Sequence, residues 1–167
     1  MSSVASEATG DRRQHRRLTA TVKESLRALG IELSLLNHKV GALLDLRDVD
    51  LDCLDLITQQ GPLSPSALAR LAGLHPATMT GILDRLERAG WVSRDRDPAD
   101  RRGIVIRALR DRGAEIFALY AGMNSSLDEL CASYDAAALE VIGDFLRRTA
   151  EAGRGATQKL TTDSSSS

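Results

Sequence analysis

Apolar residues recur at steps of three and four along the first quarter of the chain. Between Leu18 and Leu43 they stand at positions 18, 22, 26, 29, 33, 36, 40 and 43. This spacing predicts a long helix with one narrow apolar seam over residues 18–46. A helix of this length needs a surface that covers its seam, and that surface belongs either to the same chain or to a second copy of it.

Three shorter helices are predicted next, the first over about residues 50–60. Ser64 followed by Pro65 is a favourable N-cap and first turn for the second helix, which ends before Gly73. Pro76 opens the third helix, whose apolar face consists of Met79, Ile82, Leu83 and Leu86. Two short helices separated by a tight turn with glycine predict a helix-turn-helix.

The outward face of that third helix is small near its start and cationic further along. It carries Ala77, Thr78, Thr80, Gly81, Asp84, Arg85 and Arg88. Small residues let a helix approach base edges in the major groove, and hydroxyl and guanidinium groups can bond to them. The solvent-facing side of an ordinary helix is the alternative interpretation.

The periodicity then changes to that of strands. Residues 91–94 and 103–109 have strand character, and the segment 95–102 between them contains an Asp-Pro turn. A β-hairpin that follows a helix-turn-helix is a wing. Its tip carries Arg96, Arg101 and Arg102, which suit phosphates or a narrow minor groove. In the alternative, three aspartates of the same segment neutralise these arginines within a salt-bridged hairpin.

Helical spacing resumes from Asp111 and is interrupted near residues 133–135. The apolar face of the first helical stretch consists of Ile116, Leu119, Tyr120, Met123, Leu127 and Leu130. The pattern continues in the second stretch at Leu139, Ile142, Phe145, Leu146 and Thr149. We interpret residues 111–150 as dimerisation helices, with ordinary core packing as the alternative. The polar segments 1–17 and 153–167 are predicted to be disordered tails.

Composition supports a mainly α fold with a small β-hairpin. Aromatic residues make up only 3% of the 167, so Leu, Ile, Val and Ala must fill the core, which favours helix packing. The net charge of −1 hides an asymmetry, because residues 61–112 hold ten Arg and six acids (+4) whereas residues 113–152 hold two Arg and seven acids (−5). A basic middle region of this kind suits a polyanion.

Several function classes are disfavoured by the sequence. We find no apolar run long enough to cross a membrane and no secretory signal, so we expect a cytoplasmic protein. Cys53 and Cys131 stand far apart without metal-binding spacing, and no set of His, Cys and carboxylate residues converges. We therefore expect neither an enzyme nor a metal or other cofactor.

The order of these elements resembles the MarR family of bacterial regulators. The most specific part is DPADRRGIVIRALRDRG, residues 97–113, which looks like the wing of that family, and GPLSPSALARLAGL and ATMTGILDRLERAGWVSR resemble its helix-turn-helix. The resemblance implies an HTH marR-type domain over residues 18–152, with a winged helix-turn-helix core at 48–110 and dimerisation helices at 18–46 and 111–150.

The resemblance also implies site residues. Asp100 would orient the wing arginines, with Arg101 and Arg102 entering the minor groove. The full set of DNA-binding candidates is Ser64, Ser66, Ala77, Thr78, Thr80, Gly81, Arg85, Arg94, Arg96, Asp100, Arg101 and Arg102. Gly81 stands where many members carry Arg, and Arg110 replaces the usual capping Thr, which leaves Asp111 as the expected cap of the next helix.

The function that the resemblance implies is that of a homodimeric transcriptional repressor. The dimer would bind a pseudo-palindromic operator in double-stranded DNA and be released by a small aromatic or other ligand. Cys53 does not match the thiol position of the peroxide-sensing members. The alternative is a winged-helix protein-interaction module that does not bind DNA directly.

Overall fold

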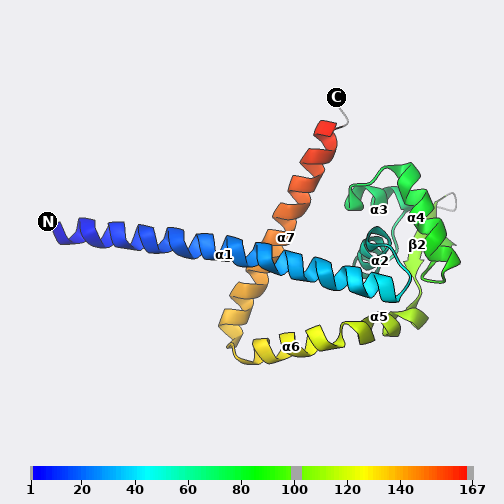
Figure 1. Ribbon diagram of the computed structural model, residues 1–167. Coiled ribbons are helices and arrows are strands. Elements are labelled where there is room, and N and C mark those ends of the chain that lie inside the picture. Colours follow the sequence, from blue (N-terminus) through cyan, green and yellow to red (C-terminus); the bar gives the residue numbers. More distant parts are fainter. Residues whose placement is uncertain (1, 99–102, 165–167) are drawn as a thin grey trace. The chain divides into compact units, whose positions relative to one another are not determined.

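The computed structural model describes residues 2–98 and 103–164 (Figure 1). The chain divides into two compact units, residues 1–47 and 48–167, and each unit is described by itself. The first contains α1 (Ser2–Leu43); the second contains α2 (Asp48–Gln60), α3 (Pro65–Ala72), α4 (Pro76–Arg88), β1 (Val92–Arg96), β2 (Ile104–Ala108), a 3-10 turn (Arg110–Arg112), α5 (Gly113–Leu119), α6 (Ala121–Ala132) and α7 (Ala136–Ser164). The predicted fold, mainly α with one small β-hairpin, is confirmed.

The long first helix is present and extends further than its apolar seam. α1 begins at Ser2, and α7 continues to Ser164, so both terminal helices enter segments for which we predicted disordered tails. Neither segment contains proline, and both contain Ala, Arg and Gln residues, which favour the helical backbone. The tail prediction relied on the absence of an apolar seam, which reports on packing rather than on helix formation.

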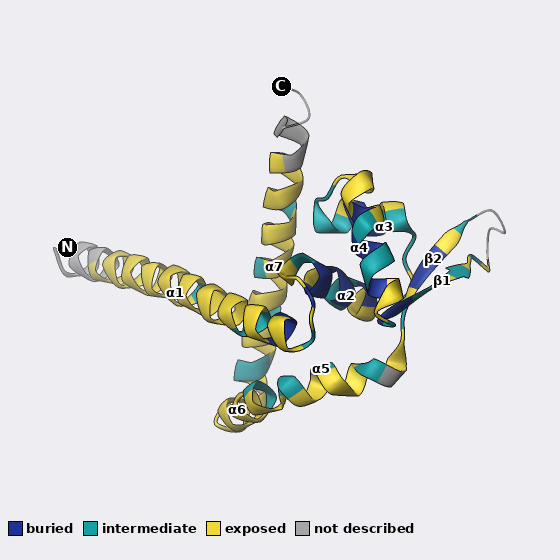
Figure 2. Cartoon of the chain, turned by 45° about the vertical axis from the view of Figure 1, so that its right-hand side comes forward, coloured by how far each residue is buried: buried dark blue, intermediate teal, exposed yellow. Residues whose placement is uncertain are grey.

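The core of the second unit lies where α2, α3 and α4 meet the hairpin (Figure 2). Its largest fully buried side chains include Leu51, Ile57, Leu68, Leu86 and Trp91. Burial of each such side chain contributes about 1.5–3 kcal/mol. The short α2–α4 helices are therefore held by this shared core, and α4 is fixed on its inner face.

The helix-turn-helix is built by local capping, as the sequence predicts. The Ser64 Oγ accepts a hydrogen bond from the Ala67 backbone N–H at 3.2 Å, and Pro65 occupies the first turn of α3. Gly73 ends α3 in the left-handed region (φ 65°). His75 then caps α4, since its Nδ1 accepts from the Ala77 N–H at 3.3 Å.

The wing is a two-stranded antiparallel hairpin in which Val92 pairs with Ala108 and Arg96 with Ile104. Leu63, in the segment before α3, adds a short antiparallel bridge to Ile106. This bridge ties the hairpin to the start of the helix-turn-helix, so the base of the wing belongs to the core.

After the wing, the chain is helical but more divided than its periodicity indicates. A bend at Tyr120 separates α5 from α6, where a single helix was predicted. Arg112, rather than Asp111, occupies the N-cap position of α5, without a side-chain capping bond. The predicted interruption near residues 133–135 is confirmed, and Asp135 caps α7, because its Oδ1 accepts from the Ala138 N–H at 2.8 Å.

Among the described residues, none of the helices has an apolar stretch of the length and hydropathy that a membrane span requires.

Candidate nucleic-acid interface

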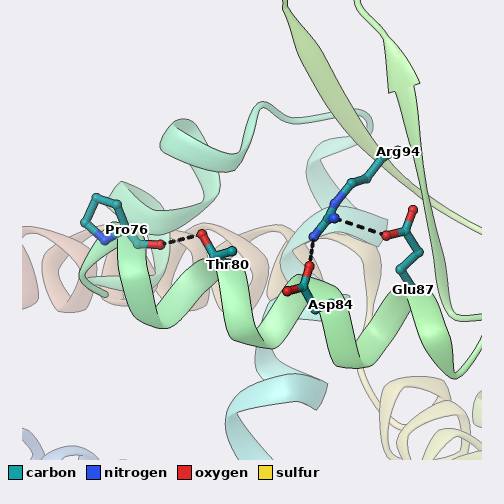
Figure 3. Close-up of polar contacts among 5 residues, drawn as sticks. All are labelled: Pro76, Thr80, Asp84, Glu87 and Arg94. Atoms are coloured by element: carbon teal, nitrogen blue, oxygen red, sulfur yellow. Dashed lines mark hydrogen bonds and ion pairs between the residues drawn. The ribbon is translucent and has the colours of Figure 1, made fainter.

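The first two turns of α4 present small residues to solvent, two of which carry hydroxyl groups. Ala77, Thr78 and Thr80 are exposed, while Met79 beside them is buried in the core. The Thr80 hydroxyl donates to the Pro76 carbonyl at 3.1 Å (Figure 3). With its hydrogen used in this way, the Thr80 oxygen can act towards an outside group only as an acceptor.

Two serines lie at the start of α3. The hydroxyl oxygens of Ser64 and Ser66 are 3.1 Å apart and share a hydrogen bond. Ser64 also accepts from the first turn of the helix, so its position is fixed by capping. Ser66 is exposed, and its hydroxyl lies beside the positive end of the α3 dipole.

Arg85, predicted to lie at the major groove, is bound within the protein. Its guanidinium donates to both carboxylate oxygens of Asp50 on α2, with Nε–Oδ2 at 3.0 Å and Nη2–Oδ1 at 2.6 Å. The Asp50 side chain is only 3% exposed, whereas that of Arg85 is 32% exposed. The hydrogen bond with Asp50 raises the pKa of Arg85, so this arginine stays charged.

Arg94 on β1 contacts helix α4. Its guanidinium pairs with Asp84 and, through Nη1, with Glu87 at 3.2 Å (Figure 3). Arg94 therefore neutralises both acids and links the wing to α4.

The outer part of the wing carries the remaining candidates. Arg96 is exposed at the end of β1 and forms no ion pair with a residue that the structure describes. Arg107 on β2 pairs with Asp95 at 3.1 Å. Asp100, Arg101 and Arg102 lie outside the described residues.

Gly81 occupies a half-exposed place on α4 between the small residues and Arg85. A Cβ at this position would meet only the Arg85 Nη1, at 3.7 Å, which is an ordinary van der Waals contact. The backbone therefore does not require glycine here.

Two contacts that hold this part of the structure together were not predicted from the sequence, and that of Asp50 is the first. Its positions relative to Leu54 and Ile57, four and seven residues later, place it on the buried face of α2. A carboxylate in that register needs a charged partner, and this signal could have identified Asp50 but not Arg85.

Arg112 is the second contact that was missed. Its guanidinium lies over the Trp91 ring at 3.7 Å and donates through Nη1 to the Ala89 carbonyl at 2.8 Å. It also forms a bidentate ion pair with Glu115, at 2.9 and 3.1 Å. One side chain thus connects the start of α5 with the end of α4 and the base of the wing.

The thiol of Cys53 and the acids beside it lie on α2. Burial, followed by the nearby charges of Asp52 and Asp50, raises the pKa of Cys53 to about 11. Burial also raises the pKa of Asp52 and of Asp55. Within the described part of the chain, no group of three or more His, Cys, Asp or Glu side chains could hold a metal ion.

Similar sequences are bacterial regulators. The sequence profile of the MarR family matches residues 46–104, which run from the turn before α2 to the start of β2. The chain is 33% identical over 134 residues to an uncharacterised HTH-type transcriptional regulator of Bacillus subtilis, YcgE, covering 80% of this chain and 87% of that protein. It is 31% identical over 90 residues to the HTH-type transcriptional repressor YetL of the same organism, covering 52% and 54%.

Solved structures share the fold. A MarR family protein from Bacillus stearothermophilus superimposes with a TM-score of 0.62 at 22% identity, covering 81% of this chain and 95% of that one. Overoxidized AbfR bound to DNA superimposes with a TM-score of 0.50 at 17% identity, covering 84% and 97%. The winged helix-turn-helix and the extended match to YcgE lead to one assignment: the chain belongs to the MarR family of transcriptional regulators.

Proposed function

We propose that this regulator binds a pseudo-palindromic operator in double-stranded DNA as a homodimer and represses transcription there. The observation that carries the proposal is the exposed start of α4, where Ala77, Thr78 and Thr80 stand clear of the core on a helix that the core fixes. A small, hydroxyl-bearing helix surface is what entry into the major groove requires.

The chemistry of α4 limits which bases it can read. Because the Thr80 hydroxyl donates to Pro76, its oxygen would accept from an adenine or cytosine amino group, and its methyl group would contact a thymine methyl. Thr78 and Ala77 add a hydroxyl and a methyl group in the same turn. Ser66, at the start of α3, would donate to a backbone phosphate.

In the proposal, the wing provides the electrostatic part of binding. Arg96 would contact phosphate, and Arg101 and Arg102 would enter the minor groove with Asp100 orienting them. Arg94 takes part by holding the wing against α4 through Asp84 and Glu87.

Exposed apolar surface supports the homodimer. On α6 and α7, Leu130, Phe145 and Leu146 are 59%, 44% and 46% exposed, and α1 leaves Leu18 58% exposed. Long helices with such apolar seams need a second copy of the chain that covers the seams and removes them from water. Two recognition helices about 34–36 Å apart would then read two half-sites.

Repression, rather than activation, is supported by a relative, since YetL is named a transcriptional repressor. In the proposed scheme a small aromatic or other ligand releases the protein from the operator, as the resemblance to the MarR family implies. Addition of a panel of aromatic acids to the preformed DNA complex would reveal such a ligand as a loss of bound DNA.

The test is a fluorescence titration of the duplex that lies directly upstream of the gene for this chain, with the wild type, Arg102→Ala and Arg96→Ala. We expect wild-type binding to weaken linearly with salt on a log–log scale, and each arginine variant to lower the slope by about one. Arg154→Ala on α7 is a matched control, because it removes the same charge outside the recognition helix and wing. Equal affinity and slope for all four proteins would overturn direct DNA binding.

A protein-interaction module without DNA binding is the second candidate. It is favoured by the neutralised arginines of the hairpin, since Arg94 and Arg107 are both paired with acids of the same chain. A pull-down that recovers a protein partner while the upstream duplex is not retained would select this candidate.

A further inference from the structure

The recognition helix has an internal tether to α2. Arg85 lies in the C-terminal half of α4, and both of its hydrogen bonds go to the carboxylate of Asp50 in the first turn of α2. The bond distances of 2.6 and 3.0 Å are those of a charge-assisted, bidentate pair. This geometry fixes the orientation of the guanidinium plane as well as the position of its charge.

The carboxylate of Asp50 cannot take part in DNA binding directly. Its side chain is 3% exposed, and it lies among the core residues Leu51, Leu54 and Ile57 of α2. A buried carboxylate is tolerated only when it is paired and hydrogen bonded, and Arg85 supplies both interactions. Asp50 therefore determines where Arg85 lies.

The apolar face of α4 holds the helix against the core, and directional bonds add control over its rotation. Met79, Ile82, Leu83 and Leu86 bury one side of the helix, but apolar contacts are non-directional and tolerate small rotations. Directional bonds fix α4 in two other places, namely Arg94 on its acidic side and Arg112 at its C-terminal end. The Asp50–Arg85 pair is the directional bond that links α4 with α2.

We propose that Asp50 and Arg85 are positioning residues for sequence-specific DNA recognition, which hold α4 at the rotation that presents Thr78 and Thr80 to base edges. Arg85 thereby acts through Asp50 and not as a contact to DNA. This inference rests on the proposed function and assigns a different role to Arg85 than the motif implies.

The test compares Asp50→Asn, Arg85→Gln and the double variant on two fluorescent duplexes. One is the duplex directly upstream of the gene, and the other is a scrambled duplex of the same length and base composition. Asn keeps the shape of the Asp50 side chain, Gln is a shorter polar side chain than that of Arg85, and both replacements remove the charge. Arg147→Gln on α7 is the control for loss of one positive charge.

We expect each single variant to lose about ten-fold in affinity for the upstream duplex, the loss of one base contact. The double variant is expected to lose no more than the single variants, because the two residues act as one unit. Affinity for the scrambled duplex and the salt slope stay at their wild-type values, since the phosphate contacts remain.

Three outcomes overturn the inference. If Arg85 contacts DNA, Arg85→Gln lowers the salt slope by about one, and Asp50→Asn, which frees the guanidinium, keeps or raises affinity. If the pair only supports folding, affinities for both duplexes fall together with the folded fraction measured by circular dichroism. Arg85→Lys keeps the charge and loses the bidentate geometry. If this variant retains the full wild-type preference for the upstream duplex, positioning is not the role of the pair.

The proposed function and this inference fail in different ways. A wild-type protein without preference for the upstream duplex overturns the proposed function and the inference with it. A wild-type preference that Asp50→Asn retains in full overturns the inference alone.

Discussion

Gly81 occupies the middle of the recognition helix without a conformational need for glycine. We expect Gly81→Ala to stabilise the protein by about 1 kcal/mol, because Ala restricts the unfolded chain and favours the helix. The new Cβ meets only a guanidinium nitrogen at 3.7 Å. For a chain of this length, the thermal midpoint followed by circular dichroism should rise by about 2–4 °C.

The same variant tests why glycine is present. Unchanged affinity for the upstream duplex would show that DNA does not need the space at Gly81. A loss of affinity with the expected gain in stability would show a close approach of α4 to the groove. A lower midpoint would contradict the prediction itself.

Cys53 is expected to be a poor nucleophile. A pKa of about 11, against an ordinary value of 9.0, lowers its thiolate fraction near neutral pH by about 100-fold. Iodoacetamide should therefore react far more slowly with Cys53 than with the thiol of glutathione at pH 7.5. The rate of its reaction with Cys53 should rise as the pH approaches 11. Mass spectrometry of Cys131→Ser, in which Cys53 is the only thiol, measures this rate without interference. Fast labelling at pH 7.5 would contradict both the burial of the Cys53 thiol and its raised pKa.

Residue-scale features were predictable from the sequence when their physical cause was local. Ser64, Gly73 and Asp135 cap or end helices through groups within a few positions, and their identities alone indicate those roles. The partners of Arg85 and Arg94 lie 35 and 10 residues away along the chain. Which charged residues meet across a fold depends on packing, so these pairs were not visible in the sequence.

At the scale of elements, Arg112 connects three segments at once. We expect Arg112→Ala to lower the free energy of unfolding by about 1–2 kcal/mol, because it removes the cation–π contact with Trp91 and the hydrogen bond to the Ala89 carbonyl. Trp91 is the only tryptophan of the sequence, so tryptophan fluorescence reports directly on its contact with Arg112. Its emission should shift to longer wavelength as water reaches the ring.

A lysine variant serves as the control for charge. Arg112→Lys keeps the positive charge near Trp91 and Glu115 but cannot form the bidentate pair. An intermediate emission shift and stability are expected. If Arg112→Ala leaves the emission of Trp91 unchanged, the contact over its ring does not shield it from water.

The boundary between α5 and α6 shows why periodicity overlooks a bend. Tyr120 N–H donates to the Ile116 carbonyl, and Asn124 N–H donates to the Tyr120 carbonyl, at 3.2 and 2.9 Å. The helical ladder thus continues on both sides of the bend, and the apolar positions keep their spacing. Hydrophobic spacing therefore predicted one helix where the backbone forms two.

At the scale of the whole molecule, charge is distributed by function. The net +4 of residues 61–112 coincides with α3, α4 and the wing, whereas the −5 of residues 113–152 falls on α5, α6 and the first half of α7. This separation was visible in the sequence because it needs no knowledge of contacts. It favours an approach to DNA through the wing-bearing region, with the acidic helices directed away.

The proposed dimer makes the last prediction. Phe145 and Leu146 on α7 are 44% and 46% exposed in the single chain. Leu146→Asp should place a charge in the covered seam and convert the dimer into a monomer, as measured by analytical ultracentrifugation. Affinity for the upstream duplex should then fall at least about 100-fold, because the two half-sites are no longer bound by one linked pair of recognition helices. Arg147→Asp is the control for an aspartate placed outside the seam, since residue 147 is 65% exposed and lies next to the seam residue on a different side of the helix. A Leu146→Asp protein that remains dimeric would place the interface elsewhere, and a monomer with wild-type affinity would show that one recognition helix is sufficient.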